Sequence, residues 1–145
     1  MSRRVELEKI IIGTLMESDG ERNYFDDCRC AISQEMFSDE VCRRLYGYIS
    51  QMNQDGRPDT RPCSILEVYG EQVKDIAVDM LEICTDYSFI HKKMEFNERR
   101  YLATIVTGHP FRRTDVEFSD YVTQFLKLVY DGEKTRYNRA EDAAA

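Results

Sequence analysis

Apolar residues recur at three- and four-residue steps along most of this chain, and no segment alternates apolar and polar residues as a strand does. The clearest example follows Ser38, a good helix N-cap residue, and closes at the turn pair Asp55-Gly56. Its apolar positions are Val41, Leu45, Tyr46, Ile49 and Met52. The spacing therefore predicts an all-α fold.

The stretch VELEKIIIGTLMESDG, residues Val5 to Gly20, combines helical spacing with an unusual glycine. Ile10 to Ile12 resemble a buried strand, but Leu7, Ile11 and Leu15 recur every four residues, and Ile12 and Met16 widen that face, which indicates a helix. A glycine inside an exposed helix costs about 1 kcal/mol relative to alanine. We therefore expect Gly13 to lie where a neighbouring helix packs closely.

Several shorter helices are expected between these stretches and the C-terminus. Capping-box spacing in Ser18–Glu21 predicts a helix through Tyr24, Phe25 and Cys28. Pro62, which a first helical turn tolerates, and the capping-box spacing of Ser64–Glu67 predict another helix that ends near Gly70. A further helix should place Ile76, Met80 and Ile83 or Cys84 on its inner side. From Thr85 to Thr107 the chain has helical segments without a clean period.

The last helix is predicted to be the longest. Thr114 and Glu117 have capping-box spacing, after the helix-breaking sequence TGHPFRR. We expect a compact multi-helix head over residues 1–113, and over 114–145 a C-terminal helix or hairpin arm with a frayed tail. One apolar stripe runs along this helix, at Phe118, Tyr121, Val122, Phe125 and Val129.

A terminal helix that protrudes from a small head cannot cover such a stripe completely, and exposed apolar patches usually mark interaction sites. The stripe is therefore our candidate interface for a second copy, as a dimer, or for a partner protein. The alternative is that it packs back onto Ile76, Met80 and Ile83 of its own head.

Composition indicates a globular protein, with 42% hydrophobic and 32% charged residues. No apolar run approaches the roughly 20 residues that span a bilayer, and the start MSRRVELEK has no secretory pattern, so we expect no membrane association and a cytoplasmic location. Five irregularly spaced cysteines favour buried thiols over disulfides or zinc. The net charge of −7 favours a solvated surface over a nucleic-acid patch at the basic pairs, Lys92-Lys93, Arg99-Arg100 and Arg112-Arg113.

Catalytic signatures are weak. DGEKT near the C-terminus lacks the glycine spacing of a phosphate-binding loop. His109 follows a glycine in a loop-like sequence, where an exposed turn histidine is the simpler interpretation. Acidic pairs such as Asp26-Asp27 fit a solvated surface. We therefore expect no catalytic, cofactor or metal residues, although a small cysteine- or histidine-dependent enzyme stays an alternative.

EKIIIGTLM, followed by ISQEMFSDEVCRRLYGYISQMNQDGRPD, resembles the N-terminal domain of DnaB-type replicative helicases. The resemblance covers about two thirds of the chain, and the segment from Tyr87 to Arg113 is longer than the family pattern. It is a pattern of core and turn positions, carried here by Glu8, Ile11, Ile12, Gly13, Leu15, Met16, Phe37, Leu45, Tyr46, Ile49, Gly56, Pro58 and Asp59.

The resemblance implies an assembly role without catalysis. Such domains form a collar on the hexameric helicase ring, pair through a helical hairpin, and dock primase or helicase-loader proteins, while a separate RecA-like domain hydrolyses ATP. It implies no direct sequence-specific DNA binding by this domain. Two further alternatives are the helicase-binding domain of a primase, which has a similar helical fold, and a helical DNA-binding regulator.

Overall fold

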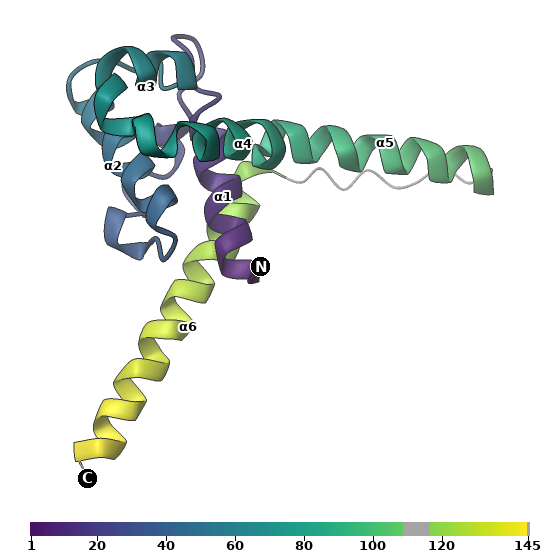
Figure 1. The fold of residues 1–145 in the computed structure, drawn as a ribbon. Helices are drawn as coiled ribbons and strands as arrows, with labels where there is room; N and C mark the ends of the chain where they lie inside the picture. The colour runs from purple at the N-terminus through teal and green to yellow at the C-terminus, as the bar shows by residue number, and fades with distance from the viewer. Residues whose placement is uncertain (109–116, 145) are drawn as a thin grey trace.

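The computed structural model describes the backbone of residues 1–108 and 117–144, and the side chains of this part except at 100, 103, 104 and 135–144. These residues are helical with no strand, which confirms the all-α prediction. Figure 1 shows a helical head from which two long helices project. The elements in chain order are α1 (Arg3–Leu15), η1 (Tyr24–Asp27), η2 (Gln34–Met36), α2 (Glu40–Gln54), α3 (Pro62–Tyr69), η3 (Gly70–Ile76), α4 (Ala77–Tyr87), α5 (Phe89–Thr107) and α6 (Phe118–Ala144).

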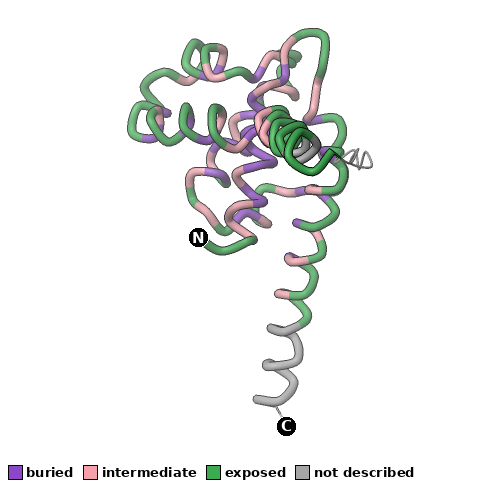
Figure 2. The backbone as a smooth tube through the Cα atoms, turned by 90° about the vertical axis from the view of Figure 1, so that its right-hand side faces the viewer, coloured by how far each residue is buried: buried purple, intermediate pink, exposed green. Residues whose placement is uncertain are grey.

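Helix α1 lies at the centre of the head, and the other helices pack around it. It contacts α4, α6, α2 and α5, and the buried stretch that it forms is visible in Figure 2. All three isoleucines, Ile10 to Ile12, are buried with at most 1% of their surface exposed. Every residue from Ile10 to Leu15 is buried, so this half of α1 is surrounded by the core, and the consecutive isoleucines belong to a buried helix and not to a strand.

Gly13 lies at the crossing of α1 with the end of α4, as the sequence predicted. A Cβ atom added there would lie 2.7 Å from the Ile83 carbonyl oxygen and 3.0 Å from the Ser88 nitrogen. Next to it, the Thr14 hydroxyl donates to the Ile10 carbonyl and accepts from the Phe89 N–H, both at 2.7 Å. Because backbone atoms approach here, only glycine allows the crossing at this distance.

We predict that Gly13→Ala destabilises the fold despite alanine's better helix propensity. The new methyl group would meet backbone atoms, which cannot rotate away as a side chain can, so the free energy of unfolding should fall by about 1–3 kcal/mol. Urea unfolding followed by circular dichroism measures this. Gly20→Ala is the matched control, because nothing lies within 4 Å of a Cβ atom there. Equal stability of the two variants would contradict a tight crossing.

Helix α2 is capped one residue later than predicted. Asp39 is the N-cap, and its carboxylate accepts from the Cys42 N–H at 3.0 Å. Ser38, the predicted cap, instead donates its hydroxyl to Glu8. The predicted inner face is confirmed at Leu45, Tyr46, Ile49 and Met52, which are buried, whereas Val41 is half-buried.

The capping boxes expected from Ser18–Glu21 and Ser64–Glu67 do not begin helices. The Ser18 hydroxyl accepts from the Tyr24 N–H and so closes a loop that leads only to the 3₁₀ turn η1. Helix α3 starts before Ser64, with Pro62 in its first turn, and ends before Gly70 as predicted. Both serines have capping-box spacing, but neither is the N-cap residue of a helix.

The expected boundary near residue 113 lies outside the described residues, and so does Thr114. Helix α6 begins at Phe118, where the Asp120 carboxylate accepts from the Glu117 N–H at 2.8 Å. Its first turns pack beside α1, so they belong to the core of the head. Helix α5 projects away from the rest of the head over 19 residues.

Candidate interaction surfaces

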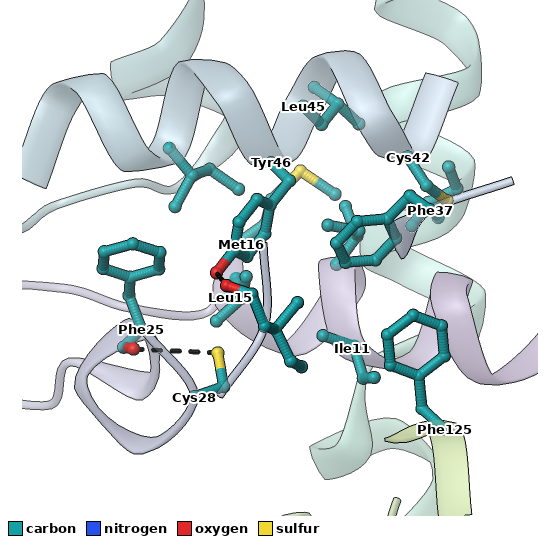
Figure 3. Close-up of a cluster of buried hydrophobic side chains, with 14 of the residues drawn as sticks. Ile11, Leu15, Met16, Phe25, Cys28, Phe37, Cys42, Leu45, Tyr46 and Phe125 are labelled. Atoms are coloured by element: carbon teal, nitrogen blue, oxygen red, sulfur yellow. Dashed lines mark hydrogen bonds between the residues drawn. The ribbon is translucent and has the colours of Figure 1, made fainter. Parts of the chain in front are cut away.

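The predicted stripe on α6 is part of the chain's own core. Phe125 is fully buried, Phe118, Val122 and Val129 are between 4% and 7% exposed, and Tyr121 is half-buried. The Phe125 ring stacks on Phe37 with centroids 5.3 Å apart (Figure 3). The prediction that this stripe is an exposed interface is therefore wrong.

The stripe is covered because α6 packs against α1. The alternative of intramolecular packing holds, although the main partner is α1 and not the face of α4 that carries Ile76, Met80 and Ile83. Arg3 fixes the pair from outside, since its guanidinium donates to the Gln124 side chain at 2.8 Å. At the start of α6, the Phe118 ring makes an edge contact with Tyr24 and a tilted contact with Phe89.

We predict that Phe125→Ala destabilises the head by about 3–5 kcal/mol, the usual cost of emptying a buried phenylalanine site. Tyr130→Ala, five residues along the same helix, is the control, because the Tyr130 side chain is 66% exposed and its removal should change stability by at most about 0.5 kcal/mol. Chemical unfolding of both variants checks the difference. A stable, helical Phe125→Ala protein would show that α6 does not complete the core.

Glu8 is a fully buried carboxylate on α1. One of its oxygens accepts from the Ser38 hydroxyl at 2.6 Å, and the other accepts from the Asp39 N–H at 2.9 Å. The Arg4 guanidinium lies 3.8 Å away and donates to the Met36 carbonyl at 2.7 Å. Glu8 and Arg4 therefore fasten the segment before α2 to α1.

The sequence contains a signal for this role that motif searches miss. Glu8 is one helical turn before Ile12 and one residue after Leu7, so it lies among the apolar positions of α1. A charged residue in that position is rarely buried unless it is paired. In the pattern that resembles the helicase family, Glu8 is only the first position, and no hydrogen bond was predicted for it.

We predict that Glu8→Ala lowers the free energy of unfolding by about 1.5–3 kcal/mol, the range for hydrogen bonds to a charged group. The substitution leaves a backbone N–H and a hydroxyl without their acceptor. Glu6→Ala is the control, since that exposed carboxylate pairs only with Arg3 on the surface, and such pairs contribute at most about 1 kcal/mol. Thermal unfolding compares them. A similar loss of stability in the two variants would contradict the conclusion that Glu8 fastens the segment before α2 to α1.

Cys28 and Cys42 are buried and Cys84 is half-buried, whereas Cys30 and Cys63 are exposed, so the prediction of buried thiols is wrong for those two. The three less exposed thiols are poorly suited to nucleophilic chemistry. Burial raises the pKa of the Cys28 thiol to about 12 and that of Cys84 to about 11, and it raises the pKa of Cys42 as well. The Cys28 thiol donates to the Phe25 carbonyl at 3.6 Å (Figure 3). These thiols stay protonated near neutral pH, so they pack as apolar groups.

The other candidate chemistry has little support in the described residues. No group of three histidine, cysteine, aspartate or glutamate side chains there could hold a metal ion. His91 lies on α5 beside Glu95 at 3.2 Å, and His109 falls outside the described part. An open hollow of about 510 Å³ beside α2 is lined by Phe25, Arg29, Ile32, Ser33, Gln34, Tyr46, Ser50 and Gln54, a set without a carboxylate or thiol.

Large apolar side chains are exposed mainly on two neighbouring helices. On α4, Val78 is 78% exposed and Leu81 is 48% exposed. On α5, the residues more than half exposed are Met94, Tyr101, Leu102, Ile105 and Val106. Contiguous exposed apolar surface of this kind marks an interaction site. No clean period was found from Thr85 to Thr107, and α4 and α5 became the candidate surface only because the stripe of α6 is buried.

Comparisons with protein-family models, with curated proteins and with solved structures give no match. Among the described helices, none is both long enough and apolar enough to cross a membrane.

Proposed function

We propose that this chain is a non-catalytic assembly and interaction domain of a replicative DNA helicase, part of the ring collar that docks primase or a helicase loader. The observation that carries the proposal is the burial of the positions that resemble the helicase family. Ile11, Ile12, Leu15, Met16, Phe37, Leu45, Tyr46 and Ile49 all lie in one core cluster. A family pattern of core positions is meaningful only if those positions pack together, as they do here.

The projecting helix α5 favours an interaction role. Helix α5 projects from the head and exposes large apolar side chains along its length. Helices of this length gain most of their stability from packing an apolar face. A domain that presents such a helix is suited to bind another protein or another copy of itself, and the proposal assigns no reaction to the chain.

The helicase-binding domain of a primase would share the same helical core, and no described residue favours it over the collar. A helical DNA-binding regulator is favoured by one observation, the basic side chains Lys92, Lys93 and Arg99 on the projecting helix α5. The surplus of acidic residues in the whole chain opposes it, because duplex binding depends on neutralising phosphates.

Binding measurements with the primase, the helicase loader and the RecA-like motor from the same source test the proposal. We expect a complex with at least one of them by size-exclusion chromatography with light scattering, and no heat of binding when the chain is titrated with Mg-ATP. The heat-denatured chain is the control for non-specific association. Absence of any such complex, together with duplex binding that weakens steeply with salt, would contradict the collar and favour the regulator.

A further inference from the structure

Helices α4 and α5 form a nearly straight rod with segregated charge. Only Ser88 separates them, and α5 continues roughly in line with α4 (Figure 1), so it is seen end-on in Figure 2. The α4 half contains Asp79, Glu82 and Asp86 and no basic residue. The α5 half contains Lys92, Lys93, Arg99 and Arg100 against Glu95 and Glu98.

Both halves also expose apolar side chains between these charges. Val78 and Leu81 are exposed on α4 beside Asp79 and Glu82, and Met94 is 66% exposed on α5 beside Lys93. The two surfaces are complementary, since each offers apolar groups flanked by charges of opposite sign. They cannot meet within one chain, because α5 leads away from α4.

We propose that α5 of one copy packs antiparallel on the outer face of α4 of a second copy, and that the second copy's α5 returns the same contact. This inference rests on the proposed assembly role and names the surface that carries it. A two-fold contact is self-complementary, so the acidic half of each rod meets the basic half of the other. A parallel pairing would instead place acidic half on acidic half and basic half on basic half.

The positions of the residues fit such a two-fold axis. An axis beside the junction of Tyr87 and Ser88 brings Leu81 level with Met94 of the second copy, because both lie equally far from the junction along the rod. The same register brings Glu82 level with Lys93. The inner side of the junction is occupied by α1 at Gly13, so the second copy approaches from the outer side.

Charge reversal tests the pairing in the full chain. Sedimentation equilibrium should show a dimer for the unmodified protein, and Glu82→Lys and Lys93→Glu should each raise its dissociation constant by at least about tenfold, because each places like charges together. The combined variant restores opposite charges in the proposed register and should recover the dimer. Recovery also excludes misfolding as the cause of the single-variant losses.

Tyr130→Glu is the matched control, because it adds a charge at an exposed aromatic residue on α6, away from α4 and α5. It should leave the dissociation constant unchanged. A monomer at every accessible concentration overturns the pairing, and so does a dimer that Tyr130→Glu disrupts while Glu82→Lys and Lys93→Glu do not. If the chain then still binds primase, loader or motor, the collar proposal stands without this surface.

Discussion

The close crossing of α1 over the end of α4 is the contact on which the head depends. At Gly13 the two backbones approach so closely that a single methyl group would overlap the Ile83 carbonyl. Thr14 then connects α1 to the first N–H of α5, so one turn of α1 sets the direction in which α5 leaves the head. The position of the projecting helix is therefore decided in the core and not at the surface.

The burial of the C-terminal half of α1 determines the position of α6. With α4 on one side and α2 on another, the remaining apolar surface of α1 is covered by the first turns of α6. The apolar stripe of α6 provides this cover, and the Phe125 ring stacks on Phe37, which lies in the segment before α2. Glu8 holds that segment in place from the polar side, so apolar packing and one buried carboxylate act on the same few residues.

Much of the fold was predictable because periodicity reports which side of a helix is buried. It predicted α1, α2 and the inner face of α4, and the cost of a glycine inside a helix predicted the close approach at Gly13. Periodicity does not report which helix provides the cover, and for that reason the stripe of α6 was assigned to a partner. The capping patterns at Ser18 and Ser64 failed for a related reason, since a cap needs a backbone direction that three or four residues do not specify.

The candidate surface was missed because the sequence from Thr85 to Thr107 was interpreted as having no clean period. The residues of α5 that are more than half exposed, Met94, Tyr101, Leu102, Ile105 and Val106, recur at the steps of one helix face, and the basic residues lie on the other side of the helix. What distinguishes the surface is the change of charge along the α4–α5 rod, and this becomes visible only once the two helices are known to run in line. An acidic half and a basic half on one straight element favour pairing in the antiparallel sense, because each half then meets its opposite. The long segment that departs from the helicase pattern is, on this argument, the part of the chain most suited to set how copies associate.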